Sequence, residues 1–220
     1  LMHGGGSLLI CGVHYFDSMR YLFGDVERVY ARVRQLGPQG AQPPDMAREN
    51  AVHAVLTFKN GMTGTWSYWT AAPGEESTDV LFYGTQGSLR DTSATPYRCW
   101  CHLLTTHEDI PDSGRVTLAD GAQIPLDEIK REFLASLDEE ARERLFPRGI
   151  TNPMAVEIRE FIQAVRGRLP GVEVDGREGL QAVACAHAVY ESSLTGEAVA
   201  VEDVLSGKKE SFQAPLNAHW

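Results

Sequence analysis

The pair Asn60-Gly61 constrains the fold of this chain more than any other local feature. It lies between "AVHAVLTFK" and "MTGTWSYW", two runs rich in β-branched and aromatic residues. Asn-Gly readily supplies the two positive φ angles of a type I′ turn, which matches the twist of paired strands. The stretch from Ala51 to Trp69 therefore predicts a β-hairpin with a type I′ turn.

The predicted hairpin carries large aromatic side chains on both faces. Because side chains alternate along a strand, Trp66 and Tyr68 share one face, and Ser67 and Trp69 share the other. An exposed apolar face of this kind is typical of a protein interface. We therefore expect a homodimer or a tetramer formed through the sheet face. The alternative is that this second face is solvated and has no partner.

Several other runs have strand character. "VERVYARVRQ" alternates along residues 26–35, with Val26, Arg28 and Tyr30 on one face. "TDVLFYG" and "GSLRD" flank the turn "GTQG", and "YRCWCHLLT" is rich in aromatic, Cys and Thr residues. Together with the hairpin they predict at least five or six strands between Val26 and Thr105, in an antiparallel or mixed sheet.

Helical periodicity precedes and follows these strands. A short helix is predicted over Val13–Phe23 and ends at Gly24. In the second half, "LDEIKREFLASLDEEARERLF" predicts one charged amphipathic helix that ends before Pro147. "TNPMAVEIREFIQAVRGRLP" predicts a helix capped by Asn152 with Pro153 at its first position. Its apolar stripe consists of Met154, Ile158, Phe161, Ile162 and Val165.

The last long helix is predicted over "DGREGLQAVACAHAVYESSLTG" and ends at Gly196. Its predicted apolar stripe consists of Leu180, Val183, Ala184, His187, Tyr190 and Leu194. Strands followed by helices favour an α+β fold, in which helices cover one face of an open sheet. The other face is then solvated or available for dimerisation.

The composition excludes some classes of partner. Thirty acidic and twenty basic residues give a formal net charge of -10, which repels polyanions, so we expect no nucleic acid partner. No apolar run reaches the length of a membrane span, so we expect no membrane partner. The N-terminus lacks the features of a signal peptide, and four sparse cysteines favour reduced thiols and a cytoplasmic location.

The segment "GGGSLLICGVHYFD" combines three glycines with a histidine and a carboxylate. No GxGxxG or GxxxxGK[ST] motif occurs, so these glycines are not predicted to hold a phosphate. On a helix, His14 and Asp17 lie at positions i and i+3 and share a face. A carboxylate there could orient the imidazole for proton transfer near neutral pH. The alternative is a structural histidine whose ring is satisfied by neighbouring groups.

Other candidate ligands carry less weight. Cys99, Cys101, His102 and His107 are close in sequence, but a single C-x-C is weak evidence and strand alternation separates Cys101 from His102. We therefore predict no metal site. His187 lies on an apolar helical stripe and is expected in the core, and nothing distinguishes His53.

Four segments, in order, resemble the C-terminal domain of the glucose-fructose oxidoreductase / inositol dehydrogenase (Gfo/Idh/MocA) family. "GGGSLLICGVHYFDSMRYLFGDVERVYA" resembles its opening GGG-x-L-x-D-x-G-x-H-x-x-D motif, and "FKNGMTGTW" its NG hairpin. "GTQGSL" resembles its GTEGSL turn, and residues 157–199 resemble its C-terminal helical pair. The resemblance implies that residues 1–220 form a single substrate-binding and oligomerisation domain. The Rossmann domain and a Glu-Lys-Pro lysine are then expected upstream of Gly4, in a longer parent.

The resemblance also implies roles for individual residues. His14 matches the catalytic histidine, which handles a hydroxyl proton together with the upstream lysine while hydride moves to or from a nicotinamide. Asp17 matches the carboxylate that closes the motif. Ile10 departs from the family, because many members have an aspartate there that an isoleucine cannot replace as a hydrogen-bond acceptor. Tyr68 and Trp69 match a loop that lines the substrate cleft, although aromatics there could equally pack in the sheet.

The resemblance implies an NAD(P)-dependent dehydrogenase or reductase that acts on a sugar, a polyol or a cyclic hydroxy compound as its small-molecule substrate. NAD or NADP is expected in the full-length parent and no cofactor in this chain alone, which by itself is expected to be inactive. Because Ile10 replaces the aspartate of the motif, three alternatives remain. Asp17 or a group outside the motif orients His14, the parent uses another proton route, or the parent has lost the activity. The alternative function is a non-catalytic module that dimerises or binds a carbohydrate.

Overall fold

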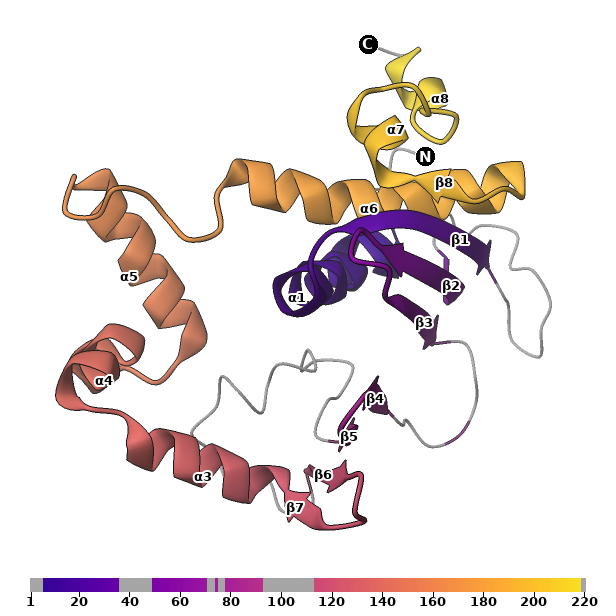
Figure 1. Cartoon of the computed structure of the whole chain (residues 1–220). Helices are drawn as coiled ribbons and strands as arrows, with labels where there is room; N and C mark the ends of the chain where they lie inside the picture. Colours follow the sequence, from indigo (N-terminus) through magenta and orange to yellow (C-terminus); the bar gives the residue numbers. More distant parts are fainter. Residues whose placement is uncertain (1–5, 36–48, 71–73, 75–77, 93–112, 219–220) are drawn as a thin grey trace. The chain divides into compact units, whose positions relative to one another are not determined.

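The computed structural model of the chain describes residues 6–35, 49–70, 74, 78–92 and 113–218 (Figure 1). These residues group into two compact units. Unit 1 consists of Leu1–Gly74 with Val174–Trp220, and unit 2 consists of Glu75–Glu173. The predicted strand at residues 97–105, with Cys99, Cys101 and His102, lies outside the described residues, as does His107.

Unit 1 contains a four-stranded antiparallel sheet in the order β3-β2-β1-β8. Its elements are η1 (Leu8–Gly12), α1 (Val13–Phe23), β1 (Val26–Arg34), β2 (Ala51–Phe58), β3 (Thr63–Trp69), α6 (Gly176–Thr195), β8 (Val199–Ala200), α7 (Val201–Leu205) and α8 (Ala214–Asn217). The helix over Val13–Phe23, the helix that ends at Gly196 and the two strands of the hairpin are confirmed.

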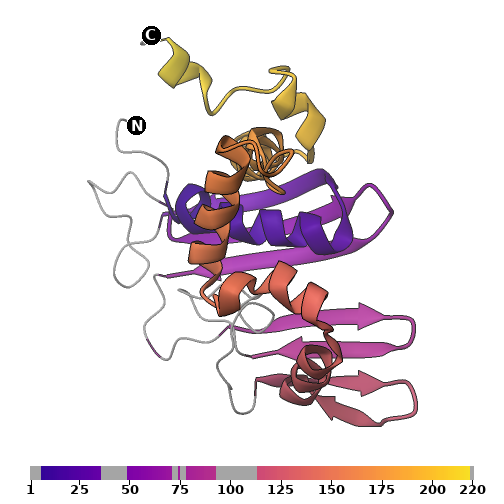
Figure 2. The same ribbon diagram turned by 90° about the vertical axis from the view of Figure 1, so that its left-hand side faces the viewer.

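One face of the unit 1 sheet is buried and the other is exposed. On β1 and β2 the buried side chains include Val29, Val52 and Leu56, whereas Tyr30 and Val55 of the same strands are 42% and 49% exposed. Figure 2 shows α1 lying over these strands. The predicted α+β fold, with helices on one face of an open sheet, is therefore confirmed.

Helix α6 covers a free edge of the sheet as well as its face. Strand β8 pairs with β1 only at Arg28 and Val29. Farther along β1, the backbone amides of Ala31 and Val33 donate hydrogen bonds to the Ser192 and Ser193 hydroxyls of α6, at 2.8 and 2.9 Å. These side chains satisfy donors that an unpaired strand edge would otherwise expose. The long α6 consequently lies along β1 (Figure 1).

The hairpin is present, but the predicted turn type is wrong. Asn60 does not have a positive φ, and only Gly61 of the pair does, at 86°. The Gly61 amide donates to the Phe58 carbonyl at 2.9 Å, so Lys59 and Asn60 form the centre of a tight turn followed by a glycine bulge. Asn60 instead uses its side chain, which donates to the Phe23 carbonyl at 2.8 Å.

Two expectations about buried faces also need correction. A register shift between Val26 and Arg28 moves Val26 to the buried face of β1, with Val29, rather than to the face of Arg28 and Tyr30. In α6, Leu180, Val183 and Leu194 are 56%, 37% and 61% exposed. The buried side of α6 consists mostly of small residues: Ala182, Ala184, Cys185, Ala186, Ala188, Val189, Tyr190, Glu191 and Ser192.

Unit 2 contains a second four-stranded antiparallel sheet, in the order β4-β5-β6-β7. Its elements are β4 (Val80–Gly84), β5 (Gly87–Asp91), β6 (Gly114–Leu118), β7 (Gln123–Pro125), α3 (Leu126–Ser136), α4 (Glu139–Leu145), η3 (Pro147–Gly149) and α5 (Pro153–Val165). The single sheet expected from the sequence is thus two sheets in the described residues, and β6, β7 and β8 were not predicted.

The helices of unit 2 confirm one prediction and correct another. Asn152 caps α5 by accepting a hydrogen bond from the Ala155 amide at 3.1 Å, with Pro153 at the first position as predicted. The single helix expected before Pro147 is wrong, because it breaks at Leu137 into α3 and α4. Asp138 caps α4 by accepting from the Ala141 amide at 2.7 Å, which starts a new helix there.

Candidate functional site

His14 lies in the first turn of α1, directly after η1. η1 is a π-helix, a wide turn that is rare in proteins and frequent at functional sites. The His14 side chain is exposed, and no hydrogen bond joins it to another residue in the described part of the chain. The imidazole is therefore free to meet a group from outside the residues described.

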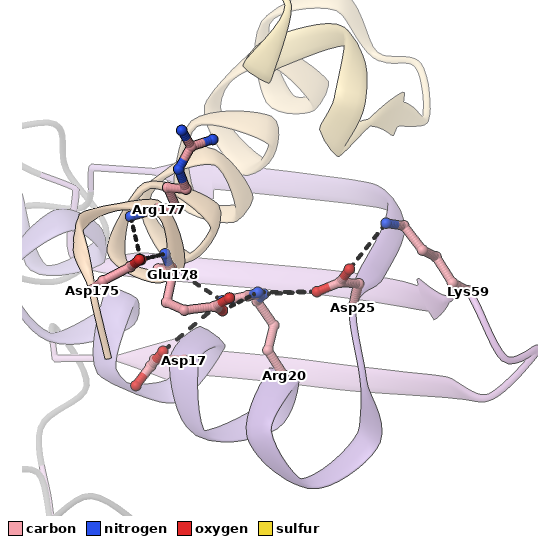
Figure 3. A network of polar contacts seen from close by, with 7 residues as sticks. All are labelled: Asp17, Arg20, Asp25, Lys59, Asp175, Arg177 and Glu178. Carbon is pink, nitrogen blue, oxygen red and sulfur yellow. Dashed lines mark hydrogen bonds and ion pairs between the residues drawn. The ribbon is translucent and has the colours of Figure 1, made fainter. Parts of the chain in front are cut away.

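Asp17 lies one turn after His14, but its nearest charged neighbour is Arg20. Asp17 Oδ1 and Arg20 Nη1 are 4.0 Å apart. The Arg20 side chain is only 8% exposed and also donates to Asp25 Oδ1 at 3.0 Å and to Glu178 Oε2 at 2.8 Å (Figure 3). Asp17 is thus at the margin of a polar cluster, and the described residues contain no hydrogen bond between it and His14.

This polar cluster joins three segments of unit 1. Arg20 also donates to the Glu178 carbonyl of α6 at 3.1 Å, and Lys59 of the hairpin donates to Asp25 Oδ2 at 3.0 Å (Figure 3). The Lys59 hydrogen bond, helped by Arg20, outweighs burial and lowers the pKa of Asp25. Burial acts to lower the pKa of Arg20, but its bonds to Glu178 and Asp25 outweigh burial and raise it. The cluster fixes α1 against α6 and the hairpin.

The start of η1 is held by Glu49, the second residue before β2. Glu49 is 8% exposed, and its Oε1 accepts a hydrogen bond from the Leu8 amide at 2.5 Å. A Cβ atom added at Gly6 would collide with the Glu49 carboxylate. The third glycine of the run is therefore required because a carboxylate occupies the space that a side chain would need.

Tyr190 of α6 completes this arrangement. Its hydroxyl is hydrogen-bonded to the Glu49 carboxylate and to the Gly6 backbone. Burial, together with the adjacent Glu49 charge, raises the pKa of Tyr190 well above its ordinary value. Neither Glu49 nor this role of Tyr190 was predicted, because the partners are distant in sequence and no short motif contains them.

Aromatic rings pack between α1 and β3. The Trp66 ring lies 5.9 Å from that of Tyr15 and 5.4 Å from that of Phe16, and it stacks on Tyr68 at 6.0 Å. A Cβ atom at Gly12 would lie 3.3 Å from Trp66, a contact tighter than usual. The small residue at the end of η1 thus lets Trp66 approach the helix that carries His14.

Tyr68 and Trp69, both predicted to bind substrate, lie on opposite faces of β3. Tyr68 shares the helix-covered face with Trp66, whereas Trp69 is 51% exposed on the other face and contacts the His53 ring at 5.8 Å. A cleft on one face of this sheet can contain only one of the two. Of the pair, Tyr68 is on the side of α1.

Ile10 and Cys11 lie in η1 just before His14. Ile10 is 57% exposed, so the residue that departs from the family motif presents an apolar side chain on the surface of the unit. Cys11 is a half-buried free thiol. Neither residue has a carboxylate, so the hydrogen-bond acceptor that the family motif places before His14 is missing at this position.

The Leu8 amide, which follows the glycine segment, already donates to the Glu49 carboxylate and is not available to a phosphate oxygen. His187 is half-buried against the rings of Phe212 and Tyr190, at 5.7 and 6.3 Å, as expected for a core histidine.

Within the described ranges, no three His, Cys, Asp or Glu side chains are grouped so as to hold a metal ion. None of the helices described there has the length and apolar character needed to cross a membrane.

The chain resembles many solved oxidoreductase structures. The WlbA dehydrogenase from Bordetella pertussis, in complex with NADH and UDP-GlcNAcA, is 24% identical with a TM-score of 0.58, over 89% of this chain and 48% of that one. An oxidoreductase from Agrobacterium radiobacter, in complex with NAD+, L-tartaric acid and magnesium, is 20% identical with a TM-score of 0.55, over 87% and 48%.

A putative myo-inositol dehydrogenase from Sinorhizobium meliloti 1021 is 20% identical with a TM-score of 0.53, over 89% of this chain and 50% of that one. At this identity the likeness shows a shared fold, and the chain spans about half the length of these structures. A comparison with curated protein sequences gives no match.

A family model provides the decisive comparison. The model of the oxidoreductase family C-terminal alpha/beta domain matches residues 2–201, which is most of the chain and includes both the glycine-histidine segment and α6. The architecture of unit 1 and the solved structures agree with this match. The chain belongs to the Gfo/Idh/MocA family of oxidoreductases and contains its C-terminal α/β domain.

Proposed function

We propose that this chain is the substrate-binding and oligomerisation domain of an NAD(P)-dependent oxidoreductase, with His14 as the acid and base that handles a substrate hydroxyl proton. The observation that carries the proposal is the position of His14, exposed in the first turn of α1 immediately after a π-helix, in a chain of an oxidoreductase family. Oxidation of an alcohol requires removal of the hydroxyl proton, and imidazole is well suited to accept it near neutral pH.

The proposed substrate class is a sugar, a polyol or a cyclic hydroxy compound. Two of the similar structures are complexes with UDP-GlcNAcA and with L-tartaric acid, and a third is a putative myo-inositol dehydrogenase. UDP-GlcNAcA, tartaric acid and myo-inositol are all hydroxylated small molecules. The half-buried Tyr68, on the side of α1, supports this class, since aromatic faces pack well against the C–H surfaces of such compounds. Tyr68 is the proposed contact.

The test replaces His14 in the full-length protein that contains this chain. His14→Ala is expected to lower kcat by about 10²- to 10⁴-fold, the usual contribution of general acid–base catalysis. His53→Ala is the matched control, because His53 is also exposed but hydrogen-bonds to Ser67 at 3.1 Å on the strands of the sheet. Turnover that survives His14→Ala unchanged would refute the assigned role.

A second candidate function is a non-catalytic module that dimerises or binds a carbohydrate. Two observations favour it: Ile10 presents an apolar surface before His14, and Asp17 lies against Arg20. The gene sequence upstream of Gly4 distinguishes the two functions, because an enzyme requires a strand, a GxGxxG loop and a helix there. For the isolated 220-residue chain we expect no measurable NAD(P) affinity by calorimetry.

We also propose that the exposed face of the unit 1 sheet associates with a second copy of the chain, as a dimer or a tetramer. Tyr30, Val55 and Trp69 are 42%, 49% and 51% exposed on this face, and exposed large apolar side chains are typical of a protein interface. Val55→Glu would place a charge beside Tyr30, its partner on β1, and is expected to give a monomer in sedimentation. Leu118→Glu, at an exposed position in unit 2, is the control. A wild-type monomer at micromolar concentration would refute the association.

A further inference from the structure

The start of η1 has an unusual set of hydrogen-bond partners. The Leu9 and Ile10 amides donate to the Gly6 carbonyl at 3.2 and 3.1 Å, so one nearby backbone acceptor serves both donors. The Leu8 amide instead donates to the carboxylate of Glu49, which is 41 residues away. Initial amides of a helix have no partner within it, and a carboxylate there also interacts favourably with the helix dipole.

The Glu49 carboxylate is confined on several sides. It accepts from the Leu8 amide, it is hydrogen-bonded to the Tyr190 hydroxyl of α6, and it occupies the space beside Gly6. Glu49 is the second residue before β2, whose register with both β1 and β3 is continuous from Ala51 to Thr57. The sheet and α6 therefore both fix this carboxylate, and the carboxylate fixes the start of η1.

We infer that Glu49 is a positioning residue, which holds the π-helix Leu8–Gly12 and thereby sets the position of His14 two residues after its end. The π-helix continues into α1 without a loop, because Gly12 and Val13 are adjacent. A shift at Leu8 is thus transmitted through a continuous helical backbone to His14. The effect of Glu49 on turnover rests on the proposed function of His14, whereas its effect on the position of His14 does not.

Glu191 provides a matched control in the same unit. It is 1% exposed, and its Oε1 accepts a hydrogen bond from the Phe212 amide at 2.6 Å. Both glutamates are therefore buried acceptors of a single distant backbone amide. Only Glu49 holds the segment that leads to His14. An effect on His14 that is the same in a Glu49 variant and in a Glu191 variant would therefore reflect loss of stability rather than loss of positioning.

The first experiment records the imidazole NMR signals of the 220-residue chain, with His14 assigned through His14→Gln. In Glu49→Ala the His14 signal is expected to move and the Leu8 amide to lose protection from hydrogen exchange. In Glu191→Ala the His14 signal is expected to stay in place while the urea midpoint falls. A folded Glu49→Ala with an unchanged His14 signal, or an equal displacement in Glu191→Ala, would overturn the inference.

Gly6→Ala perturbs the same carboxylate without removing it. Gly6 does not have a positive φ, so alanine is compatible with its backbone, but the added methyl group would displace Glu49. Gly6→Ala is therefore expected to move the His14 signal in the wild-type background and to add nothing in the Glu49→Ala background. Additive displacements would contradict a shared mechanism. Should Glu49→Ala not fold, Glu49→Gln, which keeps an acceptor oxygen, takes its place in both comparisons.

The third experiment measures turnover of the full-length protein. Glu49→Gln is expected to lower kcat about 10- to 100-fold, because small misplacements of a catalytic group carry costs of this size. KM is expected to change less than about threefold, since the substrate contacts remain. A rise in KM with unchanged kcat would overturn positioning of His14. If His14→Ala leaves turnover unchanged, the proposed function fails, and the NMR displacement still decides the role of Glu49.

Discussion

Helices α5 and α6 differ in a way that their sequences do not suggest. Helix α5 carries Met154, Ile158, Phe161, Ile162 and Val165 on one stripe, and each of these side chains is at least 39% exposed. Helix α6 buries alanines, a cysteine and a serine, and exposes its larger Leu180 and Leu194. Small residues allow α6 to approach β1 closely enough for Ser192 and Ser193 to bond its backbone. On α6, close approach to β1 therefore matters more than side-chain size in deciding which side is buried.

The sharpest test of this comparison is one substitution made at two phenylalanines. Phe16 is 0% exposed in unit 1 and Phe161 is 60% exposed on α5. Phe16→Ala is expected to lower the free energy of unfolding by about 3–5 kcal/mol, and Phe161→Ala by less than about 1 kcal/mol. Urea denaturation followed by circular dichroism measures both. Similar losses at the two sites would mean that the α5 stripe is covered.

A second test enlarges a small residue on each helix. Ala188 of α6 is 0% exposed, so Ala188→Leu forces α6 away from β1 and is expected to cost about 1–3 kcal/mol. Ala155 of α5 is exposed, and Ala155→Leu is expected to stay within about 0.5 kcal/mol of the wild type. Denaturation midpoints distinguish the two outcomes. A neutral Ala188→Leu would show that the α6 contact tolerates extra volume.

Acid titration compares the charged pairs of the two units. Asp25 is bound by Lys59 and Arg20, and Asp79 of unit 2 is bound by Arg90 alone; in each case the hydrogen-bonded cation lowers the pKa of the aspartate. A lowered folded pKa contributes stability above the unfolded value of about 3.9, and that stability is lost as the pH falls toward the folded pKa. Asp25→Asn should therefore reduce the amount of folding stability that the chain loses as the pH falls from 7 to 3.

The control for this titration is Asp79→Asn, which removes the exposed ion pair with Arg90. It should change the loss of stability between pH 7 and pH 3 by less than Asp25→Asn does. Urea midpoints measured between pH 7 and pH 3 give both curves. A larger effect of Asp79→Asn than of Asp25→Asn would contradict the view that the cluster in unit 1 is the stronger one.

The smallest expected effect concerns a thiol on the buried side of α6. Burial raises the pKa of Cys185 to about 12, so the thiolate is scarce at pH 8 and the sulfur is also inaccessible. In a variant with Cys185 as the single cysteine, labelling by a maleimide should require unfolding. A cysteine placed at Val165 of α5, which is 71% exposed, should be labelled at once. Rapid labelling of Cys185 in the folded chain would show that α6 separates from β1.

The sequence predicts His14 and Asp17 of the candidate site because both lie in one motif, and their roles stay predictions. His14 and Asp17 were identified from spacing and resemblance, and α1 has its predicted bounds. The partner of Asp17 could not be predicted, since Arg20 is shared with Asp25 and Glu178, and Glu178 is 158 residues away. Glu49 was missed for the same reason. A buried carboxylate looks like a surface residue in a sequence until its partners are known.

The sequence by itself determined where several elements begin or end. Gly24 and Gly196 end helices, Asn152 begins one, and Gly61 turns the hairpin, because each of these effects depends on the φ angle or the side chain of a single residue. The tertiary structure alone decided how the strands divide into two sheets, which side of α6 is buried, and which carboxylate holds Leu8. These outcomes depend on contacts between distant segments, whose energies no local pattern records.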